Sequence, residues 1–357
     1  MTTDSDIPVQ DRELRIVADS GIPFLNGVFE PYASVRYVPG ANICREDCAD
    51  ADVLITTTRT RCTRQLLEGT GVRLIAAATI GEDHIDTRWC RENGIDIRNA
   101  AGCNSGAVMN YVFSALYGTA SRKRISLKDK TIGIIGAGHV GSKVAMVALS
   151  LGFRVLLCDP PRARKEGPYG FVSLEELLDQ SDIVTVHVPL DETTRGMAGR
   201  DFFMRTKPGA FFINTSRGEV VDEEALKEAS GRLGPLIIDT WSHEPDIDRE
   251  LLELADIATP HIAGYSYQGK LNATAMAVRA VARFFGLSPL FEFFPQITIP
   301  ELRAQQLDLR DKNQGEVAAL LQYNYPVFTD DIRLRMAPWD FERLRDGYQL
   351  RGEFYTT

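Results

Sequence analysis

The fold class can be predicted from residues Thr131-Ile-Gly-Ile-Ile-Gly-Ala-Gly-His-Val-Gly141. Residues 131–135 form a short apolar run with β-branched side chains, which is typical of a buried parallel strand. Gly136, Gly138 and Gly141 then give the spacing G-x-G-x-x-G, and an apolar helical pattern follows them. In such a turn the first glycine makes the bend, the second admits a pyrophosphate, and the third lets the helix approach the strand. The pattern therefore predicts a dinucleotide-binding unit.

A second apolar run, Val155-Leu-Leu-Cys158, ends in Asp159, twenty-one residues after Gly138. An acid at this place accepts hydrogen bonds from both ribose hydroxyls and repels a 2′-phosphate, which favours NAD over NADP. Arg162 argues against this preference, because a nearby arginine pairs with a 2′-phosphate. The N-terminus of the helix after Gly138 offers N–H groups to the phosphates of the cofactor. We therefore expect NAD as the cofactor.

The composition excludes several classes of partner. The chain has 357 residues, enough for two or three domains, and its formal net charge of −9 argues against nucleic acid or an anionic membrane as the main partner. No apolar run approaches a membrane span, and the polar start has no signal-peptide core, so we expect a cytoplasmic protein. The six cysteines lack zinc spacing, and His, Cys, Asp and Glu do not cluster as ligands, so we expect reduced thiols and no metal.

The chain alternates strands and helices in two blocks after a leader, residues 1–13, which we expect to be disordered. Residues 14–106 are predicted as a small α/β domain, and 107–266 as a doubly wound parallel sheet of six strands. Strands are expected at 14–18, 35–38, 51–56, 73–79, 95–98, 131–135, 155–158, 182–187, 209–214, 236–239 and 256–259. Helices are expected at 107–121, 174–180, 222–230 and 273–284. The ligand crevice of a doubly wound sheet lies beyond the carboxyl ends of its strands.

The tail of the chain has a different character. Residues 267–287 contain a long helix that is expected to return to the first domain, and 288–357 are predicted as a third, α+β domain interrupted by prolines. This tail is rich in aromatic residues and arginines, the types enriched in interface cores, so it is predicted to form a homodimer contact. The alternative interpretation is a solvated cationic patch.

Three later stretches carry the chemistry: Asn214-Thr-Ser-Arg-Gly-Glu-Val-Val-Asp222, Asp239-Thr-Trp-Ser-His-Glu-Pro245 and Thr259-Pro-His-Ile-Ala-Gly264. In order, spacing and strand context they resemble the three active-site blocks of the D-isomer-specific 2-hydroxyacid dehydrogenases. The resemblance runs from about Leu14 to Phe285. It implies a Rossmann NAD domain beside a smaller, flavodoxin-like substrate domain.

Further features narrow the resemblance to one branch of that family: Ala101-Gly-Cys-Asn104, Cys158-Asp-Pro-Pro-Arg162, and His261-Ile-Ala-Gly-Tyr265 followed by Gly269-Lys270. Residues 325–354 resemble the C-terminal dimerisation domain of that branch. The implied activity is NAD-dependent oxidation of 4-phospho-D-erythronate in vitamin B6 synthesis. Two alternatives stay open: a dehydrogenase of another D-2-hydroxy acid such as 3-phosphoglycerate, and a non-catalytic NAD-sensing protein on the same fold.

The chemistry of the reaction points to a catalytic trio. Oxidation of a 2-hydroxy acid needs a base for the hydroxyl proton, a cation for the carboxylate, and a nicotinamide that takes the hydride. His261 is the predicted base, and Glu244 is expected to fix its tautomer and stabilise its protonated form. Arg217 offers a planar fork that matches a carboxylate.

The resemblance also implies binding residues. Cofactor contacts are expected at Gly136, Gly138, His139, Val140, Gly141, Asp159, Val188, Thr215, Ser216, Asp239 and Gly264. Substrate contacts are expected at Thr58, Thr79 and Tyr265. Two positions depart from the family pattern: Val188, where the family often has Thr, and Thr57-Thr58, where it has Arg-Ser. Arg59 or arginines of the tail are therefore the candidates for binding the substrate phosphate.

Overall fold

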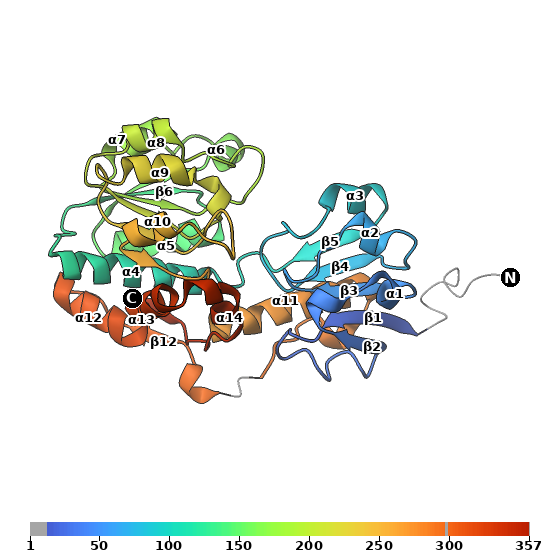
Figure 1. The fold of residues 1–357 in the computed structure, drawn as a ribbon. Coiled ribbons are helices and arrows are strands. Elements are labelled where there is room, and N and C mark those ends of the chain that lie inside the picture. Colours follow the sequence, from blue (N-terminus) through green and yellow to red (C-terminus); the bar gives the residue numbers. More distant parts are fainter. Residues whose placement is uncertain (1–12, 297–298, 357) are drawn as a thin grey trace. The chain divides into compact units, whose positions relative to one another are not determined.

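The computed structural model describes residues 13–296 and 299–356, which form two compact units (Figure 1). The first unit comprises Met1–Asn104 and Gln268–Pro300, and the second comprises Ser105–Tyr267 and Glu301–Thr357. The predicted leader lies outside the described residues except for Glu13. Residues 301–357 thus share a unit with the glycine-rich turn, while the division of the chain into three domains stays a prediction.

The first unit contains a five-stranded parallel sheet in the order β2-β1-β3-β4-β5. This is the predicted flavodoxin-like order. The strands are β1 (Leu14–Asp19), β2 (Ala33–Val38), β3 (Val53–Thr56), β4 (Leu74–Ala77) and β5 (Asp96–Asn99). Its helices are α1 (Arg45–Cys48), α2 (Arg64–Leu67), α3 (Thr87–Glu92) and most of α11 (Tyr267–Phe285). The central strands β3 and β4 are buried along their whole length because both faces of the sheet are covered: Ile55 lies in one buried cluster with Val278 of α11, and Leu54 lies in another with Leu66 of α2.

The second unit contains a six-stranded parallel sheet in the order β11-β10-β9-β8-β6-β7, which confirms the predicted doubly wound sheet. Its strands are β6 (Thr131–Ile135), β7 (Arg154–Cys158), β8 (Ile183–Val186), β9 (Phe211–Asn214), β10 (Leu236–Ile238) and β11 (Ile257–Ala258). The chain reverses its direction of winding between β7 and β8, on either side of β6. Ligand crevices in such sheets open at this place.

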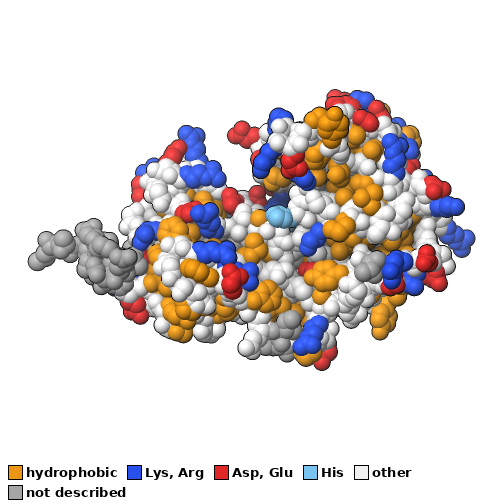
Figure 2. All heavy atoms as spheres, turned by 180° about the vertical axis from the view of Figure 1, so that it is seen from behind, with side chains coloured by type: hydrophobic (Ala, Val, Ile, Leu, Met, Phe, Trp, Pro, Cys, Tyr) orange, Lys and Arg blue, Asp and Glu red, His pale blue; other side chains and the backbone are white. Residues whose placement is uncertain are grey.

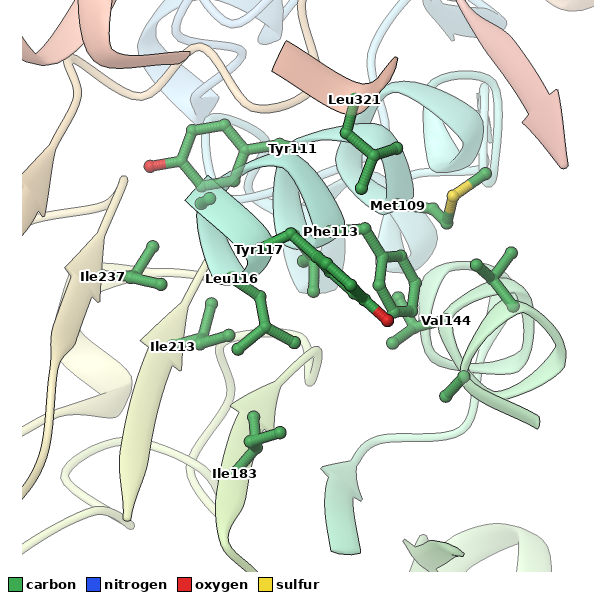
Figure 3. Packing of buried hydrophobic residues seen from close by; sticks show 14 of the residues in the cluster. Met109, Tyr111, Phe113, Leu116, Tyr117, Val144, Ile183, Ile213, Ile237 and Leu321 are labelled. Atoms are coloured by element: carbon green, nitrogen blue, oxygen red, sulfur yellow. The ribbon is translucent and has the colours of Figure 1, made fainter. Parts of the chain in front are cut away.

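Helices cover both faces of this sheet (Figure 1). One face carries α4 (Ser105–Lys123) and α5 (His139–Ser150), and the other carries α7 (Leu174–Gln180), α8 (Arg200–Arg205), α9 (Glu223–Ala229) and α10 (Arg249–Leu254). The short α6 (Pro160–Glu166) follows β7. Residues 105–120 of α4 are all buried, and Figure 3 shows Leu116 among Ile183 and Ile213 of the sheet, with Leu321 approaching α4 from another side. Partners therefore surround this helix, which buries polar side chains such as Asn110 and Ser114 among the apolar ones.

The tail supplies those further partners of α4. It forms β12 (Gln305–Leu307), α12 (Gln314–Asn324), α13 (Val327–Met336), α14 (Phe341–Asp346) and β13 (Phe354–Thr356), with β12 and β13 paired in parallel. The buried Leu321, Val327 and Phe354 belong to the cluster around α4, whereas Leu334 and Phe341 belong to the cluster on the opposite face of the sheet. Gly118 permits this packing, because a Cβ there would lie 2.7 Å from Gln322 Nε2. The apolar residues of the tail therefore complete the core of the second unit.

The surface and the thiols agree with a globular protein of mixed charge. Acidic and basic side chains are interspersed on the face shown in Figure 2. All six cysteines lie in the described part of the chain and are free thiols, five of them buried. No helix among residues 13–296 and 299–356 combines the length and the apolar character that a bilayer crossing requires.

Candidate active site

The glycine-rich turn leaves room for a phosphate group. Gly136 has φ +88°, and a Cβ there would lie 2.6 Å from His187 O. At Gly141 a Cβ would lie 2.0 Å from Gly136 O, so α5 packs closely on its strand. At Gly138 a Cβ would meet nothing within 4 Å, and α5 begins at His139 without a side-chain cap. The exposed N-terminus and the open space over Gly138 fit the pyrophosphate of a dinucleotide.

Asp159 ties the end of β7 to this turn. Its Oδ2 accepts a hydrogen bond from Ala137 N at 2.8 Å, and its Oδ1 caps α6 by accepting from Arg162 N at 3.0 Å. The Arg162 guanidinium donates twice to Glu166, at 2.9 and 2.7 Å, and also to Ala137 O. Glu166 balances the charge of Arg162, so this arginine offers little attraction to a 2′-phosphate. The carboxylate of Asp159 would repel such a phosphate. The arrangement favours NAD.

We expect Asp159→Asn to narrow the preference for NAD over NADP by at least about tenfold, because it removes the charge that repels a 2′-phosphate. Asparagine is as good a helix N-cap as aspartate, so α6 should stay intact. The measurement is kcat/KM for both cofactors in the wild type and the variant. Equal kcat/KM values for NAD and NADP in the wild type would show that Asp159 does not select against NADP.

The other predicted cofactor residues lie at strand ends and at the start of α5. His139, Val140, Val188, Thr215 and Gly264 are at least partly exposed. The Ser216 hydroxyl is buried and donates to Asn214 Oδ1 at 2.9 Å, so its side chain orders the turn. Thr215 Oγ1 lies 3.3 Å from His187 Nδ1, and burial lowers the pKa of His187 to about 3, so this ring is neutral. The cofactor contacts of these residues stay a prediction.

His261 and Glu244 form a hydrogen-bonded pair in the second unit. His261 Nδ1 lies 2.8 Å from Glu244 Oε2 and 3.0 Å from Oε1, and Trp241 N donates to Oε1 at 3.0 Å. Burial alone would raise the pKa of Glu244, but the charge and hydrogen bond of His261 and the charge of Arg345 hold that pKa below its usual value. The ionised carboxylate fixes the proton on Nδ1, which leaves Nε2 as the hydrogen-bond acceptor.

Asp239 orders the loop that carries His261. Its buried carboxylate accepts hydrogen bonds from Thr259 Oγ1 at 2.6 Å, Ile262 N at 2.9 Å and Ala263 N at 3.0 Å. Burial raises the pKa of Asp239. The structure therefore shows a side chain committed to the loop, and its predicted contact with the cofactor stays a prediction.

Arg217 follows β9, at the start of the short helix η3 (Gly218–Val220). Its Nη1 donates to Ser216 O at 2.8 Å, and Asn214 Nδ2 donates to Arg217 O at 3.0 Å. A Cβ on Gly218 would lie only 1.9 Å from Trp241 C, so the backbones of the two segments touch. Since Glu244 follows Trp241 closely in sequence and bonds His261, this contact brings the three segments of the predicted trio together.

We expect Gly218→Ala to destabilise the second unit by about 1–3 kcal/mol or more, because backbone must move to admit the methyl group. Activity should fall as well, since the same movement displaces Arg217 and Glu244. Thermal unfolding and kcat measure the two effects. Gly231→Ala is the matched control, because a Cβ there meets nothing within 4 Å. A Gly218→Ala protein with the stability and turnover of this control would contradict the prediction.

The predicted substrate residues lie in different units. Thr58 and Arg59 are exposed in the loop after β3, and Thr79 is half-buried after β4, in the first unit. Asp19 orders this loop by accepting from Thr57 Oγ1 at 2.5 Å and from Gly40 N at 2.9 Å. Tyr265 lies in the second unit, edge-on to Tyr348 with ring centroids 5.8 Å apart. The role of these residues in substrate binding stays a prediction.

Two arginines of the tail lie close to predicted site residues, which the sequence did not reveal. The half-buried Arg351 donates to Ala263 O and Tyr265 O, both at 2.7 Å, and lies 3.8 Å from the ring centroid of Tyr325. Arg345 Nη1 lies 3.6 Å from Glu244 Oε2. The only indication of these contacts in the sequence was the large number of arginines in the tail. That number does not tell which arginines point toward the site.

Comparisons with known proteins agree with this geometry. Residues 111–263 match the family described as D-isomer specific 2-hydroxyacid dehydrogenase, NAD binding domain. The chain is 46% identical to an erythronate-4-phosphate dehydrogenase of Bacteroides thetaiotaomicron over 95% of this chain and 97% of that protein. It is 38% identical to one from Yersinia pestis, over 96% and 93%.

Solved structures share the fold. A D-lactate dehydrogenase from Aquifex aeolicus, complexed with NAD and lactic acid, superposes with a TM-score of 0.61 at 25% identity, over 78% of this chain and 98% of that chain. Three findings support the same family: the matched NAD-binding domain, the near-complete coverage of the relatives and the doubly wound sheet. The chain therefore belongs to the erythronate-4-phosphate dehydrogenases, within the D-isomer-specific 2-hydroxyacid dehydrogenase family.

Proposed function

We propose that this NAD-dependent oxidoreductase converts 4-phospho-D-erythronate to (R)-3-hydroxy-2-oxo-4-phosphooxybutanoate, a step in pyridoxal phosphate synthesis. The observation that carries the proposal is the His261–Glu244 pair, with Nδ1 2.8 Å from Oε2, at the carboxyl end of a dinucleotide-binding sheet. Its support from relatives is the identity of 46% to a protein named for this substrate.

The mechanism assigns one task to each member of the trio. His261 Nε2 accepts the proton of the substrate's 2-hydroxyl, and Glu244 stabilises the resulting imidazolium through Nδ1. Arg217 pairs with the substrate carboxylate and stabilises charge on the oxygen that becomes the carbonyl. When bound, NAD would supply the acceptor for the hydride of carbon 2.

An absorbance assay tests the proposal. The full-length protein is mixed with NAD and, separately, with 4-phosphoerythronate, erythronate or 3-phosphoglycerate, and NADH formation is followed. We expect kcat/KM to be highest for 4-phosphoerythronate. A preference for 3-phosphoglycerate would assign another substrate, and tight NAD binding without turnover of any acid would indicate a non-catalytic, NAD-sensing protein.

We also propose that the tail forms a homodimer contact and that the protein is cytoplasmic. Tyr323 of α12, Met336 of α13 and Trp339 are 85%, 73% and 73% exposed, and large apolar side chains of this kind favour a protein interface. Light scattering of the wild type and of a Tyr323→Ser, Trp339→Ser double variant tests the contact. A monomeric wild type would refute it.

A further inference from the structure

We propose that Arg345, which the tail contributes, is a positioning residue for the His261–Glu244 pair and sets the pH range in which His261 acts as the base. The inference rests on the proposed function, because it assigns His261 that task. It goes beyond the predicted trio by adding a fourth member from a segment that was expected only to mediate dimerisation or to bind phosphate.

The geometry makes Glu244 a shared partner. Arg345 Nη1 lies 3.6 Å from Glu244 Oε2, the same oxygen that lies 2.8 Å from His261 Nδ1. The other carboxylate oxygen, Glu244 Oε1, also accepts a hydrogen bond from Trp241 N. At 3.6 Å Arg345 acts on Glu244 mainly through its charge rather than through a hydrogen bond.

The position of Arg345 is built into the fold. Its α14 begins at Phe341, which is fully buried in the hydrophobic core of the second unit. The side chains of Arg345 and Glu244 are only 18% and 17% exposed. Burial of a guanidinium is unfavourable unless an anion compensates it, and charges at this depth are screened little by solvent.

A second arginine on the same helix shows the contrast. The Arg343 side chain is 78% exposed and pairs with Asp340 next to α14. Exposed pairs of this kind contribute little to stability or to the charge of a distant group. Arg343 therefore represents a surface charge, whereas the charge of Arg345 is directed at the His261–Glu244 pair.

The charged and titratable neighbours of the pair enter the expected effect. Glu244 faces His261 and Arg345, and His261 faces Glu244 and Asp239. Arg345 faces Glu244, Glu342 at 3.5 Å, and Tyr265. Without the Arg345 charge, Glu244 would pair only with the His261 imidazolium. The repulsion between the Arg345 guanidinium and that imidazolium would also be lost. Protonation of His261 would then become easier.

The test is the pH dependence of kcat/KM in Arg345→Gln. We expect the acidic limb to move upward by about 0.5–1 pH unit, because a nearby cation has been lost. Glu244→Gln should move the same limb downward, since the imidazolium loses its anion. Arg343→Gln is the matched control and should leave the limb in place, and Arg345→Lys should restore it toward the wild-type position.

A second readout needs no turnover. NMR titration of isotope-labelled histidine, with the His261 signal assigned through a His261→Asn variant, should show the same upward shift in Arg345→Gln. If Arg345→Gln does not fold, Glu342→Gln serves instead, because it removes the competing partner of Arg345 at a 43% exposed position. It should move the His261 midpoint downward.

The outcomes separate the two hypotheses. An unchanged or downward midpoint in folded Arg345→Gln, or an unchanged or upward midpoint in Glu342→Gln, would overturn the role of Arg345. If the variants show the predicted NMR shifts but the wild type oxidises no 2-hydroxy acid, the proposed function is refuted and the electrostatic role of Arg345 stands.

Discussion

His261→Ala is expected to lower kcat by at least about a hundredfold, which is the scale of a positioned general base. The imidazole is the group whose Nε2 is left to accept the hydroxyl proton, because Nδ1 is held by Glu244 at 2.8 Å. NAD affinity should change little, since the proposed task of the ring concerns the substrate. Steady-state kinetics and calorimetric NAD binding measure the two quantities.

His243→Ala is the matched control for that experiment. His243 adjoins Glu244 in sequence, but its side chain is exposed, so its removal should leave turnover near the wild-type value. If instead His261→Ala kept normal turnover, His261 would be structural and another base would have to be sought.

A chain that ends after Pro300 is expected to lose the fold of the second unit. The deletion removes Leu321, Val327, Leu334, Phe341 and Phe354, all at most 1% exposed. Each buried side chain of this size contributes about 1.5–3 kcal/mol, so the sum is comparable with the roughly 5–15 kcal/mol that stabilises a whole domain. Circular dichroism, limited proteolysis and NAD binding measure the loss.

A separate dimerisation domain, as the sequence predicts for residues 288–357, would instead leave a folded and NAD-binding monomer when it is removed. The difference arises because the deleted side chains pack on α4 and on the sheet of the second unit. The Tyr323→Ser, Trp339→Ser variant is the control, since it changes the exposed surface of the tail and spares the core. A truncated chain that bound NAD and unfolded cooperatively would show that the tail is an independent domain.

The strands and the glycine-rich turn were predictable because local rules decide them. Gly136 needs φ +88°, and the apolar runs of the central sheet are typical of strands covered on both faces. The trio Arg217, Glu244 and His261 was predicted as a set of chemical groups, and its catalytic role stays a prediction. The structure adds how the three segments come together, through the backbone contact at Gly218 and the hydrogen bonds of Glu244.

Long-range packing was beyond the sequence. Val317, Ala318 and Leu321 of α12 are buried, but nothing in the sequence says that their partner is α4, some two hundred residues earlier. The carboxylate of Asp239 was expected at the cofactor, and only coordinates show that three donors of one loop already occupy it. The same holds for Arg345, whose direction depends on the burial of Phe341.

The closing strand of the tail has a consequence for synthesis on the ribosome. Asn110, on a helix made early, bonds the backbone of Phe354 through both its amide oxygen and its amide nitrogen, at 3.0 and 2.8 Å. The nascent second unit must therefore wait, with α4 incompletely covered, until Phe354 has left the exit tunnel of the ribosome. A stop codon shortly before Phe354 should consequently be nearly as harmful as a much earlier one, because the released chain exposes apolar surface that chaperones and proteases recognise.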